Sequence, residues 1–238
     1  MNTKSVFSLL KDAAINKPIY SITKFTTLDF PNHLASIFWF AKCNMACPYC
    51  YNPQIVREAG TLSEEEALNF LKTRQGRLEG VVLSGGECTL YPRLEQFCEA
   101  IKALGYKIKI DTNGSNPDRL GALISKDLID YVALDYKAPK SSFTMLTHYR
   151  HFEHLEESLN VLIKSSIPFE VRTTLHSDLL TPNDINEIIQ NLQEKGYSGT
   201  YYIQRYLHVD ETLGNTKNPL IIFDENQILK IIPIQFRN

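Results

Sequence analysis

Three cysteines are grouped in the segment KCNMACPYCYN, at Cys43, Cys47 and Cys50. Structural zinc sites usually use four ligands, and disulfides need an even number of thiols. A cubane [4Fe–4S] cluster has four irons, so three thiolates hold three of them and leave one iron open for an exogenous ligand. The CxxxCxxC spacing therefore favours a cluster with a free coordination position, at which a substrate could bind.

Two other interpretations of the cysteine group stay open at this point. Zinc would need a fourth ligand, supplied by Cys88 or a histidine, and the site would then be structural. The thiols would otherwise be unligated core groups, but Lys42, Asn44 and Pro48 flank them rather than an apolar run. Cys98 lies on the apolar face of a predicted helix, so we expect it in the core.

Strand and helix patterns alternate along the chain. Apolar runs rich in β-branched and aromatic residues predict strands at 34–41, 79–84, 106–111, 130–135, 169–175 and 200–206. Amphipathic segments between them begin with helix caps, such as Ser63 with Glu66 and Thr181 before a proline. This alternation predicts an α/β fold of parallel strands in an open or partial barrel, with functional groups at the carboxyl ends of the strands.

Length and composition fit one domain over residues 1–238, with a core at about 18–210 and appendages at both ends. The net charge of −2 gives no electrostatic reason to expect nucleic acid or a membrane surface as a partner. No run is long enough to cross a bilayer, and the first residues lack the apolar region of a secretory signal. The grouped cysteines suit a reducing compartment, so we expect a cytoplasmic protein.

A glycine-rich segment, LSGGE, follows the second predicted strand. Gly85 and Gly86 would let the backbone approach a ligand closely, and Glu87 would supply an acceptor for a charged amine. Without a ligand, the same segment would be a simple turn. The segment DTNG follows the third predicted strand and begins with Asp111, Thr112 and Asn113. These residues could contact a ligand, and the alternative is that they only form a turn that leads into a helix.

Charged residues lie at the end of the fourth predicted strand and within the fifth. Asp135 and Lys137 are two positions apart, so on a strand both side chains point to the same face. Glu170, Arg172 and Thr174 share one face of FEVRTTL in the same way. Such groups at a barrel mouth suit a polar ligand, although a surface ion pair is the common alternative for the first two.

The CxxxCxxC loop, with an aromatic residue before its last cysteine, resembles the radical S-adenosylmethionine enzymes, whose fold is a partial (β/α)6 barrel. The resemblance covers about residues 18–210, and LSGGE, DTNG and LDYKAP stand in the family's order. It implies a [4Fe–4S] cluster and S-adenosylmethionine as cofactors, with the three grouped cysteines as cluster ligands. The S-adenosylmethionine contacts that it implies are Tyr49, Gly85, Gly86, Glu87, Asp111, Thr112, Asn113, Asp135, Lys137 and Arg172.

Within that family, TKFTTLDFPNHLASIFWFAKCNMACPYCYNP is similar to the opening of the anaerobic ribonucleoside-triphosphate reductase activating proteins. This likeness implies that a radical derived from S-adenosylmethionine removes hydrogen from a glycine of a partner, the reductase. A flavodoxin or ferredoxin type electron donor is also implied. Tyr51 stands where the family usually has histidine, and Cys88 stands where proline is usual.

Two further functions stay open. A radical S-adenosylmethionine enzyme of the 7-carboxy-7-deazaguanine synthase type would act on a small molecule. A non-catalytic module would use the thiolates only to carry zinc or a cluster. His148, His151 and His154 recur at every third position, which could indicate a metal site but more often marks a solvated loop or helix face.

Overall fold

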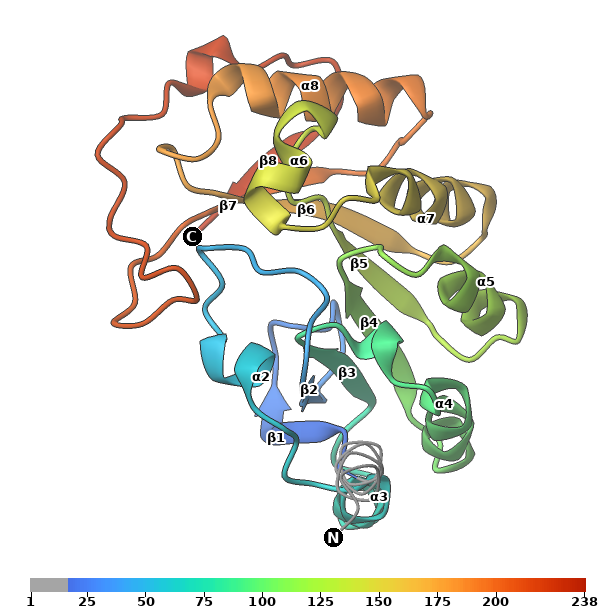
Figure 1. Ribbon diagram of the computed structural model, residues 1–238. Coiled ribbons are helices and arrows are strands. Elements are labelled where there is room, and N and C mark those ends of the chain that lie inside the picture. The colour runs from blue at the N-terminus through green and yellow to red at the C-terminus, as the bar shows by residue number, and fades with distance from the viewer. Residues whose placement is uncertain (1–16) are drawn as a thin grey trace, which may run out of the picture. The chain divides into compact units, whose positions relative to one another are not determined.

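The computed structural model describes residues 17–238 (Figure 1). Our expectations of a terminal appendage and of no secretory signal at residues 1–16 lie outside the described residues. Within residues 17–238, no helix is long and apolar enough to cross a membrane. The chain divides into two compact units whose segments alternate along the sequence, and each is described separately.

The first unit contains the described residues up to Asn44, together with 54–111 and 125–131. Its strands are β1 (Ile19–Thr26), β2 (Ala35–Phe40), β3 (Gly80–Gly85) and β4 (Lys107–Thr112). The last residue of β4, Thr112, belongs to the second unit. β1 pairs antiparallel with β2, and the pairs β2–β3 and β3–β4 are parallel. Its helices are α2 (Pro53–Arg57), α3 (Glu64–Lys72), η1 (Cys88–Leu90) and α4 (Leu94–Ala103). The first residue of α2, Pro53, belongs to the second unit.

The core of the first unit is built from β3 and from aromatic residues of its neighbours. Residues 81–83 of β3 are fully buried, as expected for a strand that is covered on both faces. Phe38 and Phe40 of β2 each pack on Phe97 of α4 with ring centroids 6.1 Å apart. This packing fixes the carboxyl ends of β2 and β3, where Cys43 and LSGGE follow.

The second unit contains residues 45–53, 112–124 and 132–238. Its strands are β5 (Tyr131–Asp135, with its first residue in the first unit), β6 (Phe169–Leu175), β7 (Tyr201–Arg205) and β8 (Ile234–Arg237), and neighbouring strands pair in parallel. Its helices are α5 (Pro117–Ser125, whose last residue belongs to the first unit), α6 (Lys140–Thr147), α7 (Phe152–Lys164), α8 (Pro182–Glu194) and η2 (Glu225–Gln227). The apolar stripe of α8 is buried as its period predicts, at Ile185, Ile188, Ile189 and Leu192.

The predicted α/β class is confirmed. Within each unit the strands follow chain order, from β1 to β4 and from β5 to β8, and of the pairings described above only β1–β2 is antiparallel. The predicted strands correspond to β2–β7. Both predicted caps are present: Ser63 Oγ accepts from the Glu66 amide at 3.2 Å, and Thr181 Oγ1 accepts from the Asp184 amide at 3.2 Å. The single-domain organisation stays a prediction.

Sequence reasoning missed the strands β1 and β8 and the helices α2, α6 and α7. Most residues of β1 are only partly buried or exposed, so its apolar pattern is weak. β8 lies in the tail that we placed outside the alternation of strands and helices. The strand nevertheless extends that alternation, because it pairs with β7 and places Ile234 opposite Tyr201. Four residues are too few to give a periodic signal, so this tail strand could be found only from its pairing.

Candidate functional site

The three grouped cysteines divide between the two units. Cys43 follows β2 in the first unit, whereas Cys47 and Cys50 belong to the second. None of the three forms a disulfide; Cys47 is buried and the other two are partly exposed. Each is therefore described with its own unit.

In the first unit, the glycine-rich segment packs directly on the backbone that precedes Cys43. The Gly86 amide donates to the Phe40 carbonyl at 2.8 Å, and the Glu87 amide donates to the Lys42 carbonyl at 2.9 Å. A Cβ at Gly86 would lie 1.9 Å from the Lys42 carbonyl oxygen and 3.1 Å from the Cys43 nitrogen. Only glycine allows this approach, so Gly86 positions the start of the cysteine loop.

Glu87 is buried and caps η1. Its carboxylate accepts from the Thr89 amide at 3.1 Å and also from the Thr89 hydroxyl. The carboxylate is thus held by local donors, which fixes its orientation. Its expected role as an acceptor for a charged amine stays a prediction.

Asp111 ends β4 within the first unit and belongs to a buried polar group that sequence reasoning missed. Its Oδ1 pairs with Lys109 Nζ at 2.6 Å, and its Oδ2 accepts from Ser84 Oγ at 3.0 Å. The Lys109 side chain is only 2% exposed. Positions 109 and 111 share one face of β4, so the KIKID pattern contained this signal, whereas the Ser84 contact depends on strand pairing.

Thr112 and Asn113 begin the part of DTNG that belongs to the second unit. Thr112 Oγ1 accepts from the Gly114 amide at 3.1 Å, and Asn113 Oδ1 accepts from the Ser115 amide at 3.0 Å. Both side chains are buried and support the turn that leads into α5. The structure thus contains the turn that we named as the alternative to a ligand contact.

In the second unit, Asp135 is held between two cations. Lys137 Nζ donates to Asp135 Oδ2 at 2.9 Å, and Arg172 Nε donates to Asp135 Oδ1. We predicted that a strand would place Asp135 and Lys137 on one face; β5 ends at Asp135, and Lys137 pairs with it from two residues beyond the strand. Arg172 joins them because it stands opposite Asp135 in the β5–β6 register. Burial alone would raise the pKa of Asp135, but the charges of Arg172 and Lys137 hold this pKa well below its usual range.

The charged group extends across β6 to β8. Arg172 Nη1 lies 4.0 Å from Glu170 Oε1, and Arg237 Nη2 lies 2.9 Å from Glu170 Oε2. Glu170 is buried, so its carboxylate depends on these cations for compensation. Sequence reasoning placed Glu170 and Arg172 on one face but missed Arg237, because that residue is on the unpredicted strand β8.

Cys47 and Tyr49 lie beside the same charged group. Burial raises the pKa of the Cys47 thiol, whereas the positive charge of Lys137 acts to lower it. Burial and the neighbouring Cys47 raise the pKa of Tyr49 well above its usual value, and its hydroxyl is enclosed. A thiolate at Cys47 would thus have the Lys137 cation as a nearby counter-charge.

The tail after β7 contacts the cysteine loop within the second unit. The Leu213 amide donates to the Cys50 carbonyl at 3.1 Å, and the Gly214 amide donates to the Pro48 carbonyl at 2.8 Å. Tyr51 stacks on Tyr206 with ring centroids 5.5 Å apart. These contacts, which sequence reasoning did not anticipate, hold the backbone of the loop between its last two cysteines.

The other cysteines are packing residues of the first unit. The Cys88 thiol is buried and donates to the Asp111 carbonyl at 3.6 Å, and burial raises its pKa well above the usual value. Cys98 is buried on α4, as predicted, and burial raises the pKa of its thiol to about 12. Neither environment favours the thiolate that a zinc ligand or a reactive thiol needs.

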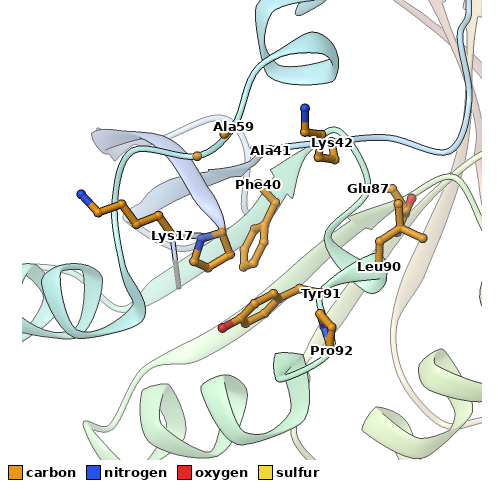
Figure 2. Close-up of a pocket in the computed structure, with 11 residues that line it drawn as sticks. Lys17, Phe40, Ala41, Lys42, Ala59, Glu87, Leu90, Tyr91 and Pro92 are labelled. Carbon is orange, nitrogen blue, oxygen red and sulfur yellow. The ribbon is translucent and has the colours of Figure 1, made fainter. Parts of the chain in front are cut away.

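A small apolar pocket lies next to the glycine-rich segment in the first unit (Figure 2). Its volume is about 190 Å³, and Phe40, Leu90 and Tyr91 form much of its wall, with Lys42 and Glu87 at one side. Pockets for small molecules usually have roughly 300–1,000 Å³. This pocket is therefore too small to be the whole binding site for a nucleoside ligand.

Residues 37–192 match the Radical SAM superfamily. The chain therefore belongs to that superfamily and is a radical S-adenosylmethionine enzyme, which excludes a module that only carries zinc or a cluster. Membership implies a [4Fe–4S] cluster and S-adenosylmethionine. The donor set fits this cluster, because none of the CxxxCxxC cysteines is used in a disulfide and the Lys137 charge acts on Cys47.

The chain is also similar to two individual relatives and to one solved structure. A Methanocaldococcus jannaschii protein named for the activation of glycyl-radical enzymes is 29% identical over 197 residues, 79% of each chain. The 7-carboxy-7-deazaguanine synthase of Haemophilus influenzae is 30% identical over 171 residues, 71% of this chain and 66% of the relative. The crystal structure of Streptococcus suis SuiB has the same fold, with a TM-score of 0.62 at 15% identity. That match covers 83% of this chain and only 47% of SuiB.

Proposed function

We propose that this protein activates a glycyl-radical enzyme, and that anaerobic ribonucleoside-triphosphate reductase is its partner. The main support is the similarity to the Methanocaldococcus jannaschii protein, which extends over 79% of both chains. The segment TKFTTLDFPNHLASIFWFAKCNMACPYCYNP, similar to the opening of the reductase activating proteins, favours this particular partner. The electron donor would be of the flavodoxin or ferredoxin type.

In this proposal Cys43, Cys47 and Cys50 hold the cluster. When bound, the cluster and S-adenosylmethionine supply a one-electron reductive cleavage and the radical that removes hydrogen from a glycine Cα of the partner. The chain's own contribution is to bind, orient and exclude water. The backbone contacts of the Leu213–Gly214 segment with Pro48 and Cys50 would keep the loop in one conformation while its thiolates are loaded.

Two sets of residues would receive S-adenosylmethionine. Gly85 and Gly86 would offer close backbone approach to its amino end, and the buried Glu87 carboxylate would supply negative charge. Asp135, Lys137 and Arg172 would lie near its ribose and carboxylate. The ion pairs among these three residues hold their charges in fixed orientations, which would reduce the cost of ordering them around the ligand. Tyr49, Asp111, Thr112 and Asn113 would complete the site.

The experiment has two stages. Anaerobically reconstituted protein is first mixed with dithionite and S-adenosylmethionine, and 5′-deoxyadenosine is measured. The reductase is then added, and electron paramagnetic resonance is used to detect the doublet of a glycine-centred radical. We expect both signals from the wild-type protein and neither from Cys47→Ala. Formation of 5′-deoxyadenosine without the doublet would contradict the proposed partner but not the enzyme class.

A second candidate is supported by the similarity to the Haemophilus influenzae enzyme. That relative is named 7-carboxy-7-deazaguanine synthase, and the two chains align over 171 residues. This function predicts formation of 7-carboxy-7-deazaguanine without any partner protein. A product assay by mass spectrometry, run beside the radical measurement, would therefore separate the two functions.

A further inference from the structure

A cluster of two imidazoles and one carboxylate lies at the start of α7 in the second unit. The sequence contains three histidines at every third position, but the structure does not group all three. His148 ends α6 in a left-handed conformation (φ 57°), whereas His151, Glu153 and His154 come together. One possible ligand atom from each of these three residues lies within 4.8 Å of the others. We propose that they form a binding site for a divalent transition-metal ion, Zn²⁺ in particular.

The side chains need only small movements to bind an ion. Zinc holds nitrogen and oxygen ligands at about 2.0–2.2 Å, so neighbouring donor atoms lie roughly 3.4 Å apart in a tetrahedral site. His151 Nδ1 is already 2.8 Å from Glu153 Oε1, and the His151 and His154 rings are nearly parallel, with centroids 5.0 Å apart. The His151 and Glu153 side chains are each 58% exposed, so they can rotate without disturbing packed neighbours.

Tyr149 supplies the support that metal-bound histidines usually have. Its hydroxyl oxygen lies 2.7 Å from His154 Nδ1, and the His154 ring is only partly exposed. An ion on Nε2 of His154 requires the proton on Nδ1, which would then donate to Tyr149. Such hydrogen bonds fix the tautomer and orientation of a ligand imidazole, and their loss typically weakens metal affinity by about 10- to 100-fold. Tyr149 therefore acts here as a positioning residue.

The donor types select the class of ion. Two imidazoles and one carboxylate match the three-ligand zinc sites in which water occupies the fourth position, and imidazole nitrogen disfavours Mg²⁺ and Ca²⁺. The amino end of α7 carries partial positive charge, which opposes a cation. The Glu153 carboxylate, whose Oε1 lies 2.8 Å from His151 Nδ1, supplies negative charge that offsets it.

The site is tested by calorimetric titration of Zn²⁺ into tag-free, cluster-loaded protein under anaerobic conditions, with iron measured before and after. We expect one Zn²⁺ per chain and no loss of iron. His154→Gln and Glu153→Gln should each weaken binding by at least about tenfold, and Tyr149→Phe should weaken it by about tenfold. His148→Gln is the matched control, because His148 is also exposed but lies outside the cluster.

Melting temperatures of all four variants without zinc would identify any loss of folding. The exposed Glu153→Gln change keeps the size of the side chain, so it is the variant least affected by such a loss. Binding that is unchanged in both Glu153→Gln and His154→Gln would overturn the proposal, as would the absence of zinc binding in the wild-type protein. If zinc uptake were matched by release of iron, the zinc would be bound by the cysteines, and this result would also overturn the proposal.

Discussion

The two units hold their candidate site residues by different physical means. At the end of β3 in the first unit, position is set by backbone: the Gly86 amide meets the Phe40 carbonyl, and no space remains for a Cβ. At the end of β5 and on the neighbouring strand β6 in the second unit, position is set by charge, because Asp135 pairs with both Lys137 and Arg172. Adding a side-chain atom should therefore destabilise the first arrangement, whereas removing a charge should destabilise the second.

The largest effect is expected at the thiols, to which both units contribute. Cys43→Ala in the first unit and Cys47→Ala in the second should each abolish nearly all cluster binding, because a three-thiolate site has no spare ligand. Iron and sulfide content after anaerobic reconstitution measures this. Cys98→Ala is the matched control: it removes a buried thiol from α4 and should leave the iron content unchanged. Retention of iron in Cys43→Ala would imply that the first unit contributes no ligand.

Gly86→Ala tests the backbone-held region. The new Cβ would lie 1.9 Å from the Lys42 carbonyl oxygen, so the backbone must shift, and we expect a loss of about 3 kcal/mol in the free energy of unfolding. Chemical denaturation measures it.

Gly121→Ala provides the matched control for that substitution. Gly121 lies inside α5, and the nearest atom to its added Cβ, on Val161, is 3.9 Å away. Because alanine is the better helix former, this variant should gain about 0.5–1 kcal/mol. Equal destabilisation of the two variants would contradict the special role of Gly86.

The same contrast explains what the sequence could predict. Spacing along one strand placed Asp135 and Lys137 on one face, and helix caps such as Ser63 could be read from local residues. Contacts between distant segments could not be read in this way. The glycines of LSGGE indicated close approach, but not that Lys42 is the neighbour of Gly86. Arg237 was missed because its partner Glu170 is reached only after β8 pairs with the sheet.

Arg172→Gln tests the charge-held region. The variant leaves the partly buried Asp135 carboxylate with one cation fewer, and we expect a loss of about 2 kcal/mol in the free energy of unfolding at neutral pH. The folded-state pKa of Asp135 is depressed, so its ionisation stabilises the protein above the unfolded pKa of about 4, and this contribution is lost as pH falls through the folded pKa. Removing Arg172 raises the folded pKa, so acid unfolding should begin at a higher pH. Denaturation measured between about pH 7 and pH 3 checks both effects.

Arg205→Gln is the matched control for the charge-held region. Arg205 pairs with Glu225, but the two side chains are 44% and 45% exposed, so the loss should stay below about 1 kcal/mol. The pH dependence of this variant should resemble that of the wild-type protein. Equal losses of stability in Arg172→Gln and Arg205→Gln would show that the lower exposure of the Asp135 ion pairs does not make them stronger than the Arg205–Glu225 pair.

The smallest effect is expected at Tyr51, which joins the cysteine loop to the tail within the second unit. Its hydroxyl oxygen accepts from the Leu207 amide at 2.8 Å, and its ring stacks on Tyr206. Tyr51→Phe keeps the stacking and leaves an amide that water can reach, so the cost should be about 0.5–1 kcal/mol. Tyr51→Ala removes the ring as well and should cost about 1 kcal/mol more. Both variants should keep wild-type iron content after reconstitution, because in this interpretation Tyr51 supports the backbone of the loop and not the cluster. Loss of iron in Tyr51→Phe would instead assign its hydroxyl to the site itself.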